Sequence, residues 1–211
     1  MIIKKLTEEA FASNNYLVIC EDTNEAVLID AGWDNEKTIE KVKETQVNLK
    51  YIFYTHAHMD HICGDHALKE KFNLKAFMHI EDKFLVDMFK EQLGMFGMPD
   101  RENPVVDEFI SEGQELEVGK LKFKVIHTPG HSPGSVCYLS EDALFSGDTL
   151  FANSVGRTDL PGGNFEQLRD SIVNQLFKLD NEIKVYPGHG PTTTIGNEKL
   201  NNPFFGRNSR I

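Results

Sequence analysis

Residues 54–65 read YTHAHMDHICGD and place three histidines and two aspartates within twelve positions. The stretch overlaps LKYIFYT (residues 49–55), which we expect to form a short strand. The cluster therefore begins just past the carboxyl end of a strand, where α/β folds usually place their functional groups. Polar side chains in this number contribute little to the packing of an apolar core. We therefore expect this segment to bind a ligand.

The composition is that of a soluble globular protein. The chain has 211 residues, of which 40% are hydrophobic and 26% are charged, close to the averages for such domains. We find no repeat or low-complexity linker and expect a single domain over residues 1–211. The three cysteines are few, odd in number and widely spaced, which favours a reducing compartment over a disulfide framework.

Charge and hydropathy exclude several classes of partner. The formal net charge of −11 disfavours nucleic acid, because phosphate binding needs clustered Lys and Arg. No apolar run approaches the ~20 residues that span a bilayer. Glu8 and Glu9 stand where a signal peptide would have its apolar core. We expect a cytoplasmic protein with a small-molecule substrate, and the sequence predicts no oligomeric state.

The amino-terminal third predicts a hairpin of strands at 14–22 and 24–32, followed by a helix that Asp34 would cap. Residues Ile39, Val42 and Thr45 would form the buried stripe of this helix. Further predicted elements are a helix at 65–73, a strand at 74–79, a helix from 81 that Gly94, Gly97 and Pro99 interrupt, strands within 105–110, 115–131, 134–140, 142–151 and 183–193, and an amphipathic helix at 165–180.

The remaining candidate ligands also follow predicted strands and lie in Gly/Pro loops. His131 lies in HTPGHSPGS, Asp148 in LFSGDTLF and His189 in YPGHGPTT. Such loops hold a tight backbone that lets side chains converge on a point. Imidazole and carboxylate together suit zinc, iron or manganese. His66, His79 and His127 occur singly, and we interpret them as structural histidines.

The spacing within residues 56–61 supports two metal ions. His56 and His58 point the same way in an extended segment and can bind one ion. Asp60 and His61 lie one turn further on and can face a second ion, while the carboxylate of Asp148 can bridge both. Two ions sharing a water would convert it to hydroxide near neutral pH.

These motifs resemble the signatures of a known family. THAHMDH is similar to the H-x-H-x-D-H motif of the metallo-β-lactamase superfamily, and the three later motifs match in order. GRTDLPGGN and TIGNEKLNNPF resemble segments of its short glyoxalase II-like (hydroxyacylglutathione hydrolase-like) members. The resemblance implies a four-layer αβ/βα sandwich, in which two mixed β-sheets pack face to face with helices on the outside.

The resemblance also implies a ligand set and a reaction. His56, His58 and His131 would hold one metal, Asp60, His61 and His189 the other, and Asp148 would bridge them. We expect zinc first, with iron or manganese also compatible. The implied reaction is thioester hydrolysis, as of S-lactoylglutathione, in which a metal-bridging hydroxide attacks the acyl carbonyl and Asp60 orients it or carries its proton.

Two features depart from the family pattern. The family often has a pair of glycines after D-H-x, and Cys63 occupies the first of these positions. Cys63 could be a packing residue, which we favour, or a reactive thiol. Only about twenty residues follow His189, so we expect no helical domain of the kind that binds glutathione in longer members. Lys199, Arg207 and Arg210 in this tail cannot replace it, which leaves the thioester unspecified.

Two other residues are candidates for substrate binding. Arg157 could bind a substrate carboxylate or pair structurally with an acid such as Asp159. Phe96, in the methionine-rich MFKEQLGMFGM, could belong to an apolar lid or simply pack.

The alternative function is an iron-dependent persulfide dioxygenase of the same superfamily, although PGHGP at the last histidine is typical of hydrolases. Hydrolysis of another ester or lactone is also open. A β-lactamase, a nuclease and a non-enzymatic metal-binding protein rank lower.

Overall fold

The computed structural model describes residues 1–33 and 35–209 and contains two six-stranded sheets. The first sheet has the order β1 (Ile2–Thr7), β2 (Asn14–Ile19), β3 (Glu25–Ile29), β4 (Asn48–Phe53), β5 (Lys75–His79) and β6 (Glu108–Ile110). Its first three strands are antiparallel, and β3 to β6 run parallel. The parallel strands are the ones that need helical crossovers.

The second sheet comes from the other half of the chain. Its order is β14 (Thr193–Thr194), β13 (Lys184–Pro187), β10 (Ala143–Gly147), β9 (Val136–Ser140), β8 (Leu121–His127) and β7 (Glu115–Val118). Only β10 and β13 pair in parallel. A two-stranded ribbon of β11 (Leu150–Phe151) and β12 (Ser154–Val155) lies beside it.

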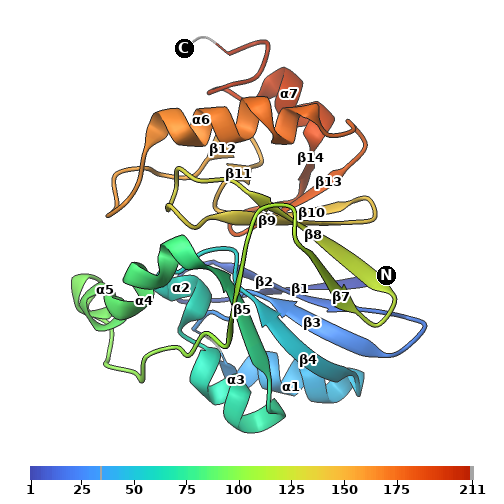
Figure 1. Cartoon of the computed structure of the whole chain (residues 1–211), viewed down its shortest axis with the longest axis vertical. Coiled ribbons are helices and arrows are strands. Elements are labelled where there is room, and N and C mark those ends of the chain that lie inside the picture. Colours follow the sequence, from blue (N-terminus) through green and yellow to red (C-terminus); the bar gives the residue numbers. More distant parts are fainter. Residues whose placement is uncertain (34, 210–211) are drawn as a thin grey trace.

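Helices cover the outer face of each sheet (Figure 1). The first sheet carries α1 (Asn35–Thr45), α2 (Met59–Ile62), α3 (Asp65–Phe72), the 3₁₀ turn η1 (Ile80–Asp82), α4 (Lys83–Asp87) and α5 (Phe89–Met95). The second carries α6 (Phe165–Asn174), η2 (Leu176–Lys178) and α7 (Ile195–Asn201). The predicted αβ/βα sandwich is confirmed. None of the helices in the described part is long and apolar enough to cross a bilayer.

Strand alternation divides the interior into three apolar layers. In β2, Leu17 and Ile19 face the helices, whereas Tyr16 and Val18 face the other sheet. Successive side chains of a strand point to opposite faces, so a strand that is buried on both faces is apolar throughout. The third layer packs Leu168 of α6 against the second sheet.

The helical predictions need two adjustments. The helix expected over 165–180 ends at Asn174, because Gln175 leaves helical geometry (φ −121°, ψ −66°) and a 3₁₀ turn follows. Its apolar stripe is nevertheless buried, with Leu168, Ile172 and Leu176 inaccessible to solvent. In α1, Val42 is buried, while Ile39 and Thr45 are only partly so. The predicted cap Asp34 lies outside the described residues.

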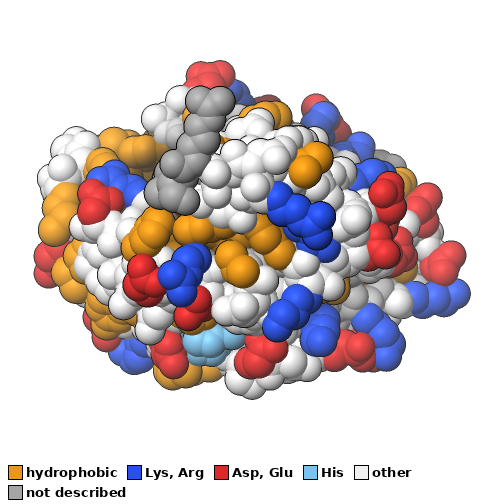
Figure 2. All heavy atoms as spheres, turned by 90° about the horizontal axis from the view of Figure 1, so that it is seen from above, with side chains coloured by type: hydrophobic (Ala, Val, Ile, Leu, Met, Phe, Trp, Pro, Cys, Tyr) orange, Lys and Arg blue, Asp and Glu red, His pale blue; other side chains and the backbone are white. Residues whose placement is uncertain are grey.

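Some apolar side chains remain on the surface. Figure 2 looks onto the face that carries α6 and α7, where hydrophobic side chains lie among charged ones. Phe165 and Val173 of α6 and Leu200 of α7 are among the exposed large apolar residues. Scattered exposure of this kind is normal for a folded chain.

Phe53 is the centre of the layer between the sheets. Its ring lies 5.4 Å from that of Phe77, 5.6 Å from Phe123 and 5.3 Å from Tyr138. Phe53→Ala should lower the free energy of unfolding by about 3–5 kcal/mol, the usual range for emptying a buried aromatic site. Urea unfolding of the purified protein measures this.

The matched control is Phe109→Ala in edge strand β6, a residue that is 46% exposed and does not belong to this layer. It should change stability by less than about 0.5 kcal/mol. Equal losses in the two variants would contradict the assignment of Phe53 to the core.

Candidate metal centre

Four chain segments bring the seven predicted ligands together. His56 and His58 follow β4, and Asp60 and His61 lie on the short helix α2. The remaining three lie in loops after β8, β10 and β13, which carry His131, Asp148 and His189. These segments lie at the carboxyl ends of strands, as the sequence predicted.

Two groups of side chains form around neighbouring points. One nitrogen or oxygen from each of His56, His58 and His131 lies within 4.8 Å of the others, and the same holds for Asp60, His61 and His189. These are the two predicted sets. Asp148 lies between them, with Oδ2 3.5 Å from Nε2 of His131 and also 3.5 Å from Nε2 of His189.

The centre needs a glycine at one close approach. A Cβ at Gly188 would lie 2.2 Å from Oδ1 of Asp148 and 2.8 Å from Cε1 of His61. No real Cβ comes so near, so any side chain at position 188 would displace the ligands. This contact gives a physical reason for the glycine in YPGHGPTT.

The donor atoms fit a cation. Among the described residues, four buried polar atoms of this centre lack a hydrogen-bond partner: Nε2 of His56, Nε2 of His58, Nε2 of His61 and Oδ1 of Asp148. Leaving such atoms unpaired inside a protein is costly. Cations bound between imidazoles and carboxylates would satisfy them, and the donor set suits zinc, iron or manganese.

Burial and neighbouring charges set the protonation of the histidines. Burial, followed by the nearby imidazole of His131, lowers the pKa of His58 to about 3. The pKa of His56 is lowered for the same reasons, with His61 as its main neighbour. Both rings are therefore neutral near pH 7, which is the form that binds metal.

His61 behaves in the opposite way. Burial alone would lower its pKa, but the carboxylates of Asp60, Asp148 and Asp30 outweigh burial and raise it to about 10. For Asp60, burial favours a higher pKa, and the imidazoles of His61 and His189 overcome it and lower the pKa. In the metal-free protein a cationic His61 and an anionic Asp60 stabilise each other.

Asp30 is a functional residue that the sequence analysis missed. It is buried at the end of β3, and its Oδ2 accepts hydrogen bonds from Nδ1 of His61 at 2.8 Å and from Oγ1 of Thr55 at 2.8 Å. Its Oδ1 accepts from the amide of Thr55 at 2.7 Å. A carboxylate behind a ligand imidazole fixes the orientation of the ring. The sequence feature that could have identified Asp30 is its position at the end of a predicted strand, in LIDAG.

Asp82 was missed as well. This buried carboxylate accepts hydrogen bonds from the amide of Ala57 at 2.9 Å, the hydroxyl of Ser132 at 2.7 Å and the amide of Gly134 at 2.6 Å. It therefore joins the loop of His56 and His58 to the loop of His131. Burial raises the pKa of Asp82 against these three hydrogen bonds.

A cavity of about 240 Å³ opens beside the centre and is lined by five of its ligands. Arg157 and Phe96 both line it, so that each lies where it could contact a substrate. Their role in substrate binding stays a prediction. The guanidinium of Arg157 pairs with Asp159 through two contacts of 2.7 and 2.6 Å, as the structural alternative expected. The carbonyl of Arg157 also accepts a hydrogen bond from Nδ1 of His131.

Cys63 belongs to none of the ligand groups found in the described residues. It is buried in the apolar layer under the first sheet, and this burial raises the pKa of its thiol. A raised thiol pKa suppresses the reactive thiolate. The packing interpretation of Cys63 fits these surroundings.

Two of the histidines interpreted as isolated are in contact. The rings of His79, at the end of β5, and His127, at the end of β8, stack with centroids 4.0 Å apart and planes 16° from parallel. Glu81 completes a group that could hold a cation. Because the two rings are nearly parallel, their in-plane lone pairs do not converge on a single ion. We therefore interpret this pair as a contact that joins the two sheets.

The chain belongs to the metallo-β-lactamase superfamily, whose sequence model matches residues 9–189. It is similar to hydroxyacylglutathione hydrolase GloC of Haemophilus influenzae, with 37% identity over 99% of this chain and 100% of that protein.

Two solved structures are also similar over the whole fold. BLEG-1 B3 metallo-β-lactamase matches with a TM-score of 0.90 and 37% identity, covering 96% of this chain and 99% of that one. TTHA1623 in a di-iron-bound form matches with a TM-score of 0.88 and 36% identity, covering 96% of this chain and 100% of that one. The predicted family and fold are confirmed, and this chain is a metal-binding protein of the superfamily.

Asp30→Asn should weaken metal binding by about 10- to 100-fold, because the neutral amide no longer holds the ring of His61 with a charge. Asparagine tolerates the left-handed backbone of this position (φ +61°), so the fold should survive. Metal content after dialysis against graded chelator measures the change. The control Asp65→Asn removes another buried carboxylate, which accepts from Tyr54 and Val105. Equal metal affinity in Asp30→Asn and the unmodified protein would contradict this role.

Metal uptake at pH 7 should release about one proton from His61, because its pKa of about 10 keeps it protonated in the metal-free protein. His189, whose pKa is also raised, should add part of a second. The apparent metal affinity should therefore rise with pH up to about 10. Titration calorimetry at pH 7 in two buffers of different ionisation enthalpy counts the protons. A binding enthalpy that does not depend on the buffer would contradict the expectation.

Proposed function

We propose that this protein is a metal-dependent hydrolase of thioesters. The observation that carries the proposal is the pair of three-residue groups with Asp148 between them, open on one side to the cavity. Two divalent ions held there would acidify a water and polarise the acyl carbonyl. His56, His58 and His131 would hold one ion and Asp60, His61 and His189 the other, with zinc expected first.

The cavity lining favours a leaving group that needs no proton donor. Apart from the five ligands that line it, Arg157 is the one titratable side chain among the described lining residues. An amine or alkoxide leaves only with help from a general acid, whereas a thiolate leaves without one. In the proposed reaction, water oxygen bonds to the acyl carbon, the C–S bond breaks, and sulfur takes the bonding pair. The products are a carboxylate, a thiol and one proton.

Asp60 is our candidate for the residue that accepts the proton of the water. It lines the cavity, and its Oδ2 lies 3.2 Å from Nε2 of His189. Its lowered pKa keeps the carboxylate ionised, so that it can accept a hydrogen bond from the water. We propose that it orients the attacking water and carries its proton away, in addition to binding metal.

The relatives support hydrolysis at the level of the class. The Haemophilus influenzae relative is named a hydroxyacylglutathione hydrolase, and the neighbour of TM-score 0.90 is named a B3 metallo-β-lactamase. S-lactoylglutathione is therefore the first substrate to test, with a β-lactam as the second. A persulfide tests the dioxygenase alternative.

Purified protein should hydrolyse S-lactoylglutathione with about two metal ions per chain. His58→Ala should lose at least one ion and about 100-fold or more in kcat/KM, because it removes a ligand of one group. Absorbance at the thioester band and elemental analysis on the same sample measure both. Full metal occupancy without thioester turnover, together with cleavage of a β-lactam or O₂ uptake with a persulfide, would overturn the proposal.

A further inference from the structure

We infer that the cavity selects its substrate by an apolar group, so that the preferred substrates are thioesters of short apolar acyl chains. This inference rests on the proposed function and specifies its substrate class. It makes Phe96 and Met88 specificity-determining residues. The argument depends on what lines the cavity and on which polar groups there remain free.

Most of the walls beyond the metal ligands are apolar, and Gln92 and Arg157 are the two polar residues of the described lining. The apolar residues are Phe11, Met59, Leu85, Met88, Met95, Phe96, Leu160 and Pro161. At about 240 Å³ the cavity is smaller than the ~300–1,000 Å³ of sites that enclose drug-sized ligands. It can hold an acyl chain of a few carbons, and a tripeptide such as glutathione would remain largely outside.

Gln92 offers almost nothing to a substrate, although it lines the cavity. Its Nε2 donates to the carbonyls of Ala57 at 3.1 Å and Leu85 at 2.8 Å. Its Oε1 accepts from the amide of Met59 at 3.0 Å. The side-chain amide is therefore used to hold α5 against the ligand loop.

Arg157 is the one arginine or lysine among the described lining residues, and its charge is already paired. It pairs with Asp159 through two contacts in the bidentate geometry that suits a guanidinium and a carboxylate, although both side chains are more than half exposed. The two carboxylates of a glutathione conjugate would have to compete with Asp159 for this single group. The chain as a whole carries a net charge of −11, which gives no long-range attraction to an anionic substrate.

Phe96 is held in place as a wall of the cavity. Its ring meets Phe11 edge to face at 6.3 Å, and Phe11 meets Trp33 in the same way at 6.5 Å. The guanidinium of Arg101 covers Trp33 at 3.5 Å. Phe96 nevertheless stays 50% exposed, so an apolar acyl chain beside it would bury surface that water now covers.

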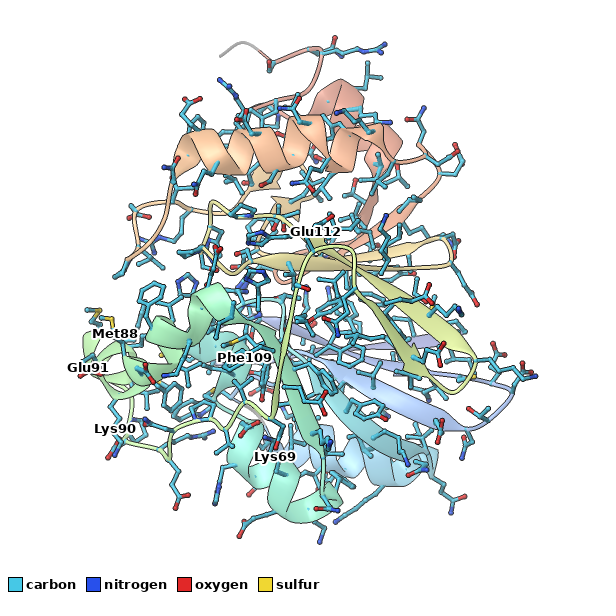
Figure 3. All side chains as sticks on the ribbon, in the orientation of Figure 1. Lys69, Met88, Lys90, Glu91, Phe109 and Glu112 are labelled. Atoms are coloured by element: carbon cyan, nitrogen blue, oxygen red, sulfur yellow. The ribbon has the colours of Figure 1, made fainter. Side chains whose placement is uncertain are left out.

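Met88 lies at the junction of α4 and α5 and lines the cavity, whereas Glu91 on α5 is exposed and does not. Figure 3 shows both on this segment at one edge of the molecule. Methionine adapts to ligands of different shape. Glu91 is therefore a matched control for Phe96 and Met88.

The test uses metal-loaded protein and N-acetylcysteamine thioesters with acetyl, butanoyl and hexanoyl groups, alongside S-lactoylglutathione. Because a buried methylene contributes about 0.8 kcal/mol, kcat/KM should rise about threefold to fourfold per methylene until the cavity is full. Phe96→Ala and Met88→Ala should lower the ratio of the hexanoyl value to the acetyl value by about tenfold and keep the metal content. Glu91→Ala should leave the whole series unchanged.

The outcomes separate this inference from the proposed function. A series that is flat in chain length, or S-lactoylglutathione cleaved faster than the hexanoyl thioester and unaffected by Phe96→Ala, overturns the apolar selection and leaves thioester hydrolysis standing. No cleavage of any thioester by fully metal-loaded protein overturns both.

Discussion

The buried carboxylate of Asp30 is the constraint on which the arrangement of the centre depends. It joins the end of β3 to Thr55 after β4 and to the ring of His61 on α2. Thr55 in turn contacts Nδ1 of His56 at 3.0 Å. One residue thus connects two strand ends to ligands from both predicted metal groups, which explains why a non-glycine residue is kept in a left-handed conformation there.

The rest of the centre crowds buried polar groups together, and not all of them find a hydrogen-bond partner among themselves. Nδ1 of His58 and Nε2 of His131 lie 2.8 Å apart and share a hydrogen bond, but four other buried polar atoms of the described centre lack partners. Neutral His56 and His58 stand beside a cationic His61 and an anionic Asp60. Cations would remove both the unpaired atoms and the need for the proton on His61. We propose that the polar centre binds the metal ions and catalyses the reaction, and that the apolar cavity beside it selects the substrate.

Short-range patterns in the sequence predicted most of the helices and strands, whereas the four-layer fold and the full ligand set followed from the resemblance of its motifs to the superfamily. Period-two and period-3.6 hydrophobicity located most elements, and Gly/Pro loops marked where His131, Asp148 and His189 would lie. The residues that it missed act through contacts between distant segments. In the sequence, nothing distinguishes Asp30 and Asp82 from other acidic residues at strand ends and turns. Their contacts with Thr55 and Ser132 appear only in the folded chain. The contact of His79 with His127 likewise depends on how the two sheets pack, which no local pattern contains.

The most direct test of the account is anomalous diffraction from a crystal of the protein grown with zinc. The account predicts two peaks, one in contact with His56, His58 and His131, the other in contact with Asp60, His61 and His189, and both beside Asp148. A single peak at another group, such as His79 and His127, or no peak among these seven residues, would contradict it.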